Sequence, residues 1–233
     1  MTKTVIIQPS YLPWLGYFEM MYMCDVFVFY DDVQYTKSDW RNRNRIKGPE
    51  GVSWLTVPVK TKGRFPQPLN MVEINNDSNW RKKHLDTLQR FYASAPYFKE
   101  VFGAIKPVYE KEWYMLNHLN IELTRTIIDI LGFEKKLLLS SKLNVPFFDN
   151  PAQRVVEVCK TVNTTHFYNG AAGRNLYSHR LFEENGIVLE FQDYHHPVYS
   201  QLWGEFQPYL SVIDLLFNHG EESLPIIRGK LLQ

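Results

Sequence analysis

Residues 4–32, TVIIQPSYLPWLGYFEMMYMCDVFVFYDD, decide the fold. Residues 4–7 and 26–30 are short, continuous apolar runs, which are typical of buried strands. Residues 17–24 carry the pattern of a helix, and a loop with two prolines separates it from the first run. A strand, a helix and a second strand within about 30 residues predict a βαβ unit with parallel strands.

Polar residues follow both predicted strands, at the end of a parallel sheet where ligands bind. Gln8 and Tyr11 follow the first strand, and Asp31 and Asp32 follow the second. The two aspartates are adjacent, so their side chains should point to opposite sides and do not form an obvious metal pair. Asp31 is a candidate general base or a carboxylate that orients an amine. The alternative is that one of the two caps a turn.

The rest of the chain alternates strands and helices, without internal repeats. Further strands are expected over residues 52–59, 136–140 and 187–191, and helices over 80–131 (interrupted at Pro96 and Pro107), 151–162 and 210–218. We therefore expect a single α/β domain over residues 1–233, with a largely parallel sheet of the nucleotidyltransferase-like or Rossmann-like type. Its middle region should be mostly helical, and a helical subdomain over 80–131 stays open.

The composition excludes several classes of protein. Lys+Arg 26 against Asp+Glu 25 gives a net charge of +1, which argues against nucleic acid as the main partner. Two cysteines are too few for a disulfide-rich secreted scaffold. No apolar run reaches the ~18 residues of a membrane span, and residues 1–3 lead into a strand rather than a signal peptide. We expect a cytoplasmic protein. Its aromatic content of 15% suits either a sugar or nucleotide pocket or an aromatic core.

Cations alternate along residues 37–47, which read KSDWRNRNRIK. In an extended chain, side chains two residues apart share a face, and the odd positions here are Lys37, Arg41, Arg43, Arg45 and Lys47. Asn42 and Asn44 would point to the other face. Guanidinium and ammonium groups on one face suit a phosphate or diphosphate. The alternative is a solvated edge strand that its charges protect from aggregation.

Two histidines are candidate catalytic bases. His84 follows Arg81, Lys82 and Lys83, whose charges would lower its pKa and keep it neutral; the alternative is a surface histidine. His195 follows a predicted strand and is adjacent to His196. No third ligand stands at a suitable spacing, so we predict no metal site.

The cysteines and serines offer no clear nucleophile. Cys159 shares a helix face with apolar residues and Cys24 ends a helix beside an apolar strand, so we expect both in the core. The Gly-x-Ser-x-Gly element of serine hydrolases does not occur in the sequence. A direct transfer without a covalent enzyme intermediate is the simpler enzymatic option.

The chain resembles the WbqC-like family of bacterial proteins nearly end to end. The segments that carry the resemblance are 8–17 (QPSYLPWLGY), 25–34 (DVFVFYDDVQ), 40–46 (WRNRNRI), 54–58 (WLTVP), 80–84 with Tyr92 and 95–98, and 194–220. The first of these motifs is the most distinctive.

The resemblance implies a role in making surface polysaccharide, such as lipopolysaccharide O-antigen. It also implies acyl or aminoacyl transfer to the amine of a nucleotide-linked sugar, with a thioester on an acyl or peptidyl carrier protein as donor and no other cofactor. In that scheme His84 or His195 is the base and Asp31 orients the amine. The residues expected to contact substrate are Gln8, Tyr11, Lys37, Asn42, Arg43 and Arg45.

Two other functions stay open at this stage. One is a nucleotide-sugar-binding or assembly protein without catalysis. The other is a nucleotidyltransferase, against which the absence of any histidine before His84 counts. The oligomeric state is open too, a homo-oligomer included.

Overall fold

The computed structural model describes residues 1–229, which divide into two compact units. The sheet unit comprises Met1–Gln8, Glu19–Val33 and Lys135–His195. The helical unit comprises Pro9–Phe18, Gln34–Glu134 and the chain from His196 onward. Each unit is thus assembled from three separate stretches of sequence. The expectation of a single domain stays a prediction, and residues 80–131 lie wholly within the helical unit.

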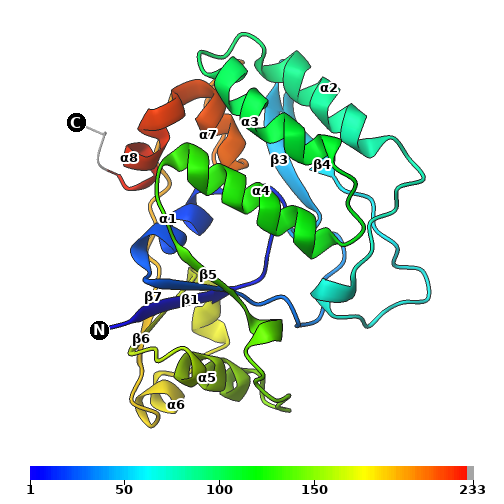
Figure 1. The fold of residues 1–233 in the computed structure, drawn as a ribbon. Coiled ribbons are helices and arrows are strands. Elements are labelled where there is room, and N and C mark those ends of the chain that lie inside the picture. The colour runs from blue at the N-terminus through cyan, green and yellow to red at the C-terminus, as the bar shows by residue number, and fades with distance from the viewer. Residues whose placement is uncertain (230–233) are drawn as a thin grey trace. The chain divides into compact units, whose positions relative to one another are not determined.

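The sheet unit contains a five-stranded parallel sheet of order β5-β2-β1-β6-β7 (Figure 1). Its strands are β1 (Lys3–Ile7), β2 (Val26–Phe29), β5 (Lys136–Leu139), β6 (His166–Asn169) and β7 (Val188–Phe191). This confirms the predicted α/β fold and the opening βαβ unit. The strand order runs outward from β1 in both directions, so the topological switch point lies between β1 and β6.

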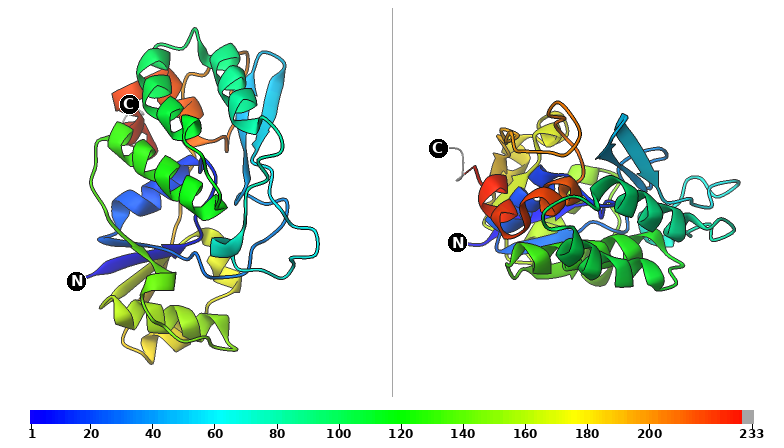
Figure 2. Two further views of the ribbon diagram at one scale, coloured as in Figure 1. Left: turned by 45° about the vertical axis from the view of Figure 1, so that its right-hand side comes forward. Right: turned by 90° about the horizontal axis from the view of Figure 1, so that it is seen from above.

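Helices cover both faces of this sheet. α5 (Pro151–Thr161) and α6 (His179–Glu183) lie on one face, and the Glu19–Met23 part of α1 (Leu15–Met23) lies on the other (Figures 1 and 2). Apolar side chains of alternate strand positions pack against α5 and α6, among them Ile6, Val28, Phe167 and Leu189. The thiols of Cys24 and Cys159 are buried and free, and burial raises the pKa of each to about 12. Both cysteines are core residues, as predicted.

The helical unit places three helices side by side (Figure 2), namely α2 (Trp80–Tyr92), α3 (Phe98–Glu110) and α4 (Leu116–Leu131). Gly132 ends α4 with a φ of 71°, as the sequence predicts. The predicted break at Pro107 is wrong, because Pro107 lies inside α3. It sits near the end of the helix, and the burial of Val108 and Tyr109 compensates for one missing backbone hydrogen bond.

The helical unit also holds an antiparallel hairpin of β3 (Arg43–Gly48) and β4 (Gly51–Thr56), and two C-terminal helices, α7 (Val212–His219) and α8 (Ser223–Ile227). The short 3₁₀ turns of the chain are Leu69–Met71, Ser140–Lys142, Ala171–Asn175 and Gly220–Glu222. Within residues 1–229, no helix is long and apolar enough to cross a membrane.

The cationic run is extended only in part. Residues 37–42 form turns, because Ser38 adopts a left-handed φ of 55° and the Asp39 carboxylate accepts a hydrogen bond from the Trp40 N–H. The shared face predicted for five cations therefore holds for the three within β3, which are Arg43, Arg45 and Lys47.

Candidate functional site

Asp31 follows β2 and holds the turn after β5. Its carboxylate accepts hydrogen bonds from the Ser141 N–H (3.0 Å), the Ser141 hydroxyl (2.8 Å) and the Ser140 hydroxyl (3.1 Å). The side chain is 1% exposed. Both carboxylate oxygens are thus engaged, which is what the alternative of a turn-capping aspartate predicts.

Asp32 points to a different set of partners. One carboxylate oxygen lies 2.5 Å from Nη2 of Arg154, and the other accepts a hydrogen bond of 2.5 Å from Ser140. The Arg154 guanidinium also lies over the ring of Tyr30, at 5.2 Å from its centroid. Together these contacts tie β2 and β5 to the first turn of α5, so the polar residues after these strands bind one another.

Two other predicted site residues meet inside the helical unit. The Tyr11 hydroxyl lies 2.8 Å from Nδ1 of His84 and also bonds the Tyr109 hydroxyl. Both Tyr11 and His84 are buried. Burial lowers the pKa of His84 to about 4, although a hydrogen bond with the Thr56 backbone opposes the shift. The neutral state predicted for His84 is therefore supported, but burial rather than neighbouring cations causes it.

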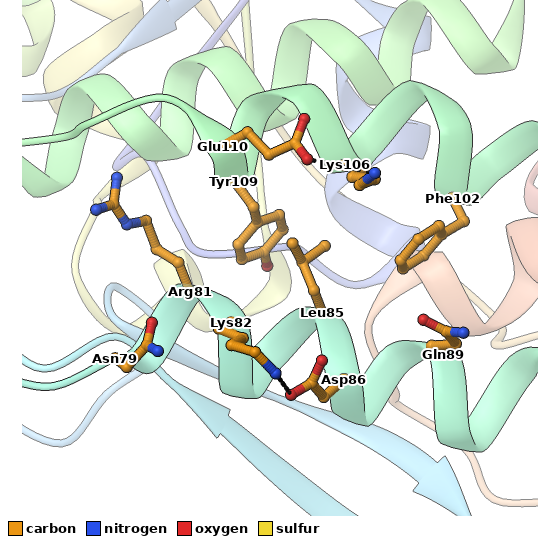
Figure 3. Close-up of a pocket in the computed structure, with 10 residues that line it drawn as sticks. All are labelled: Asn79, Arg81, Lys82, Leu85, Asp86, Gln89, Phe102, Lys106, Tyr109 and Glu110. Atoms are coloured by element: carbon orange, nitrogen blue, oxygen red, sulfur yellow. Dashed lines mark hydrogen bonds and ion pairs between the residues drawn. The ribbon is translucent and has the colours of Figure 1, made fainter.

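A pocket of about 350 Å³ lies between α2 and α3, close to this cluster (Figure 3). The Tyr109 ring forms part of its lining, together with Leu85 and Phe102. Four charged side chains at its rim form pairs, Lys82 with Asp86 (2.7 Å) and Lys106 with Glu110 (3.3 Å), whereas Arg81 donates to the Lys111 carbonyl. The lining of the pocket is therefore mixed, with one positive charge that no carboxylate of the lining neutralises.

Three further predicted residues differ in their exposure. Gln8 is half-buried directly after β1, at the switch point of the sheet. His195 is exposed in the segment after β7. Lys37 is exposed as well, with its ammonium 4.7 Å from the centroid of the Phe65 ring.

The asparagines of the cationic run serve the backbone. The Asn44 amide donates to the Leu12 carbonyl (2.7 Å), and the Asn42 amide donates to the Val57 carbonyl (2.9 Å). Both side chains are buried. Asn44 therefore fixes the loop that carries Tyr11 and lies on the opposite face of β3 from the cations, as predicted. Asn42 lies in the turn before β3, where strand alternation does not apply.

The arginines of β3 are packed on exposed tryptophans, in what we call the arginine–tryptophan stack (Trp40, Arg43, Arg45 and Trp54). The Arg43 guanidinium lies 4.4 Å from the Trp54 ring centroid, and that of Arg45 lies 5.7 Å from Trp40. The two indoles stack at 5.6 Å with an interplanar angle of 29°. Cation–π contacts of this kind hold a guanidinium in place while its N–H groups stay available.

The two guanidiniums of the stack make no ion pair, although Asp39, which pairs with Arg41 at 3.8 Å, interacts with Arg43 at longer range and has its pKa lowered by hydrogen bonds and by both arginines. Among residues 1–229, no carboxylate lies within 4.0 Å of Arg43 or Arg45. Each guanidinium donates to a backbone carbonyl instead, Arg43 to Ser38 (2.5 Å) and Arg45 to Tyr209 (2.9 Å). Their Nε atoms are buried and make no hydrogen bond. A pair of preorganised guanidiniums with spare donors is a site for an anion.

The tryptophans of this site escaped the sequence-based prediction. Trp40 precedes the strand, and Trp54 becomes its neighbour only through the pairing of Arg45 with Trp54 across the hairpin. The alternation of β4 could have shown that Trp54 shares a face with its cross-strand partner. Nothing in the sequence indicates that Trp40 turns back onto this face.

Comparison with known proteins agrees with the resemblance. The sequence model of the WbqC-like protein family matches residues 8–226. The chain belongs to the WbqC-like family. It is also 38% identical over 230 residues to an uncharacterized protein of Mycobacterium tuberculosis, Rv1507c, and the match covers 98% of each chain. No solved structure matches the chain.

The family match includes both the loop with Tyr11 and the arginine–tryptophan stack. These are the segments where the geometry brings predicted residues together: Tyr11 with His84, and Arg43 with Arg45. Gln8, Asp31 and His195 belong to the sheet unit, while Tyr11, Lys37, Asn42, Arg43, Arg45 and His84 belong to the helical unit.

Proposed function

We propose that this WbqC-like protein binds a nucleotide-linked amino sugar and transfers an acyl or aminoacyl group to the sugar amine. The observation that carries the proposal is the arginine–tryptophan stack, in which Arg43 and Arg45 present two guanidiniums without a carboxylate partner. A sugar nucleotide offers a diphosphate for these donors and flat groups for the indoles. The predicted setting is surface-polysaccharide synthesis in the cytoplasm.

The transfer needs a donor with an activated carbonyl, and we propose a thioester on a carrier protein. The neutral amine would attack the carbonyl carbon, forming the amide C–N bond while the C–S bond breaks. The amine loses its proton to a base, and the departing thiolate takes up a proton to leave as a thiol. Much of the acceleration would come from positioning the two substrates.

Of the two candidate bases, His195 is exposed, whereas His84 is buried and bonded to the Tyr11 hydroxyl. A base must reach the proton that it removes. We expect His195→Ala to abolish turnover and to leave the binding of the sugar nucleotide unchanged.

A second candidate function, binding without catalysis, is favoured by a different observation. Asp31 and His84, two of the three predicted catalytic residues, are buried and hydrogen-bonded within the protein. A binding protein would retain the arginine–tryptophan stack but would show no turnover with any thioester donor.

A thermal-shift screen against nucleotide-linked sugars, with free nucleotides and ATP as controls, tests the proposal. A ligand at 100 times its Kd stabilises the folded state by about 2.7 kcal/mol. Stabilisation by an amino-sugar nucleotide beyond the free nucleotide supports binding, and turnover with carrier-protein thioesters then separates transferase from binding protein. Stabilisation by ATP alone would favour nucleotidyl transfer instead.

Arg43→Ala shows whether the stack is the binding site. We expect the affinity for the sugar nucleotide to fall at least tenfold, because hydrogen bonds to a charged group are worth about 1.5–3 kcal/mol each. The Tm should change little, as in the control Arg180→Ala, which removes an arginine whose side chain is 87% exposed. If Arg43→Ala lowers the Tm as clearly as it lowers the affinity, Arg43 is structural.

A further inference from the structure

Tyr209 adjoins the arginine–tryptophan stack through its backbone. Its carbonyl accepts the hydrogen bond from Nη2 of Arg45 (2.9 Å), and its N–H donates to Nε2 of His196 (3.1 Å). Its side chain is 52% exposed. The segment from His196 to Tyr209 therefore places an exposed tyrosine at the residue whose backbone binds the Arg45 guanidinium.

His196 holds the Tyr209 backbone in place through a hydrogen bond. Because Nε2 accepts from the Tyr209 N–H, the ring proton must sit on Nδ1, which lies 2.8 Å from the Pro197 carbonyl. The imidazole is stacked on Trp14 (centroids 6.4 Å apart, 14°) and meets the edge of the Tyr209 ring at 5.0 Å. His196 is thus a neutral positioning residue with both nitrogens engaged.

The backbone of Tyr209 is strained, with a φ of 58°. This left-handed conformation suits glycine or asparagine, and a larger side chain adopts it at a cost. The two backbone hydrogen bonds of Tyr209 do not require a side chain, so glycine could make both. The tyrosine ring has one side packed against Trp14 (5.9 Å between centroids) and His196, while half of the residue stays exposed for other contacts.

We propose that Tyr209 and Trp40 form a stacking subsite for the planar base of a nucleoside diphosphate. In this arrangement Arg45 binds the phosphates next to the base. Arg45 contacts both residues: its guanidinium donates to the Tyr209 carbonyl and lies over the ring of Trp40. Trp40 is 43% exposed, so each ring has surface to offer. This inference rests on the proposed function and adds the part of the ligand that the 196–209 segment recognises.

The chemistry separates the two halves of such a ligand. The guanidiniums hold phosphate oxygens, and pyrophosphate alone satisfies them. The aromatic rings can act only on a molecule with a flat π-face, and stacking tolerates any base. A nucleoside diphosphate should therefore bind more tightly than pyrophosphate, by an amount that depends on Tyr209 and Trp40.

Calorimetric titration of ADP, UDP and inorganic pyrophosphate tests the subsite on the full chain. We expect the wild type to bind ADP and UDP at least about tenfold more tightly than pyrophosphate. Tyr209→Gly should erase that advantage, leave pyrophosphate affinity unchanged and change the Tm little, because relief of the strained φ offsets the lost packing of the ring on Trp14 and His196. Trp40→Leu should reduce the advantage as well. Tyr114→Leu, which alters another exposed tyrosine of the helical unit (66% exposed), is the matched control.

The outcomes distinguish the two proposals. If ADP and pyrophosphate bind the wild type equally well, or if Tyr209→Gly keeps the advantage, the stacking subsite is overturned while the anion site stands. An equal loss for ADP and pyrophosphate in Tyr209→Gly would also overturn it, because the effect would then come through Arg45. If the wild type binds none of the three, the subsite is overturned, and the screen against nucleotide-linked sugars decides the proposed function separately.

Discussion

The polar residues after β2 and the arginine–tryptophan stack of β3 and β4 use their charges in opposite ways. Asp31 and Asp32 have partners for every carboxylate oxygen, from two serines and Arg154. Arg43 and Arg45 each donate to one backbone carbonyl and face no carboxylate within 4.0 Å in residues 1–229. We call the first group closed, because the protein itself supplies partners for its charges, and the second open, because its charges have no ion-pair partner.

This difference teaches where binding should be sought. The end of a parallel strand is the usual place for a ligand, yet here the carboxylates at the ends of β2 and β5 hold the chain together. A closed polar group contributes to stability, whereas an open group contributes to affinity. Substitutions in the two regions should therefore have separable effects.

The largest effect is expected from Asp31→Ala, which should lower stability and leave ligand affinity alone. The change leaves the partly buried Ser141 hydroxyl and the Ser141 N–H without their acceptor, whereas the Ser140 hydroxyl keeps Asp32, at a cost of about 4 kcal/mol. That corresponds to a Tm decrease of roughly 8–16 °C in a chain of this size. Thermal unfolding measures it, with the exposed Asp149→Ala as the control. A loss of affinity at unchanged Tm would mean that Asp31 contacts the ligand rather than stabilising the turn after β5.

His84 is a second closed group, and its effect appears with pH. Its pKa is about 4 when folded against 6.5 unfolded, so below pH 6.5 the unfolded chain takes up a proton that the folded chain refuses. Its contribution to stability is complete above pH 6.5 and declines as the pH falls toward 4, by about 3 kcal/mol in total.

Urea unfolding of the wild type and His84→Gln between pH 7 and 4 isolates this contribution, because all carboxylates titrate in both proteins. The difference in unfolding free energy between the two should shrink as the pH falls. A difference that stays constant over this range would show that His84 is protonated as easily in the folded protein as in the unfolded chain.

The smallest effect is expected from Trp54→Leu, which leaves both guanidiniums in place but removes the ring under Arg43. Cation–π contacts at exposed sites are worth about 0.5–1 kcal/mol, so affinity for a nucleoside diphosphate should fall two- to fivefold. Phe147→Leu, at a side chain that is 84% exposed, should change nothing. If Trp54→Leu also changes nothing, the indole does not preorganise Arg43.

The sequence pattern predicts most of the fold because the elements of the sheet unit carry strong local signals. The apolar runs of β1 and β2, the helix that starts at Pro151 and the glycine that ends α4 are all visible locally. The antiparallel hairpin was harder, because only the turn at Ser38 and Asp39 limits β3 to Arg43–Gly48. Such a turn depends on hydrogen bonds that alternation alone does not reveal.

The candidate site was predictable only in its cations. Alternation placed Arg43 and Arg45 on one face and Asn44 on the other, as the structure shows. The pairing of Ser140 with Asp31 spans 109 residues, and that of Arg45 with Tyr209 spans 164. Contacts over such distances along the chain require the fold itself, so no local motif could indicate which charges would be closed.

The position of β1 in the middle of the sheet has a consequence for synthesis. β1 pairs with β2 on one side, where Thr4 lies opposite Val26, and with β6 on the other, where Lys3 lies opposite His166. On the ribosome, β1 therefore waits for a partner strand that is made 163 residues later. At about 5–20 residues per second, that wait lasts roughly 8–30 s. During this wait, the edge of β1 that later pairs with β6 has no partner strand. Unpaired strand edges of this kind can associate with other chains. The nascent chain therefore passes through a period in which its central strand is unpaired on one side.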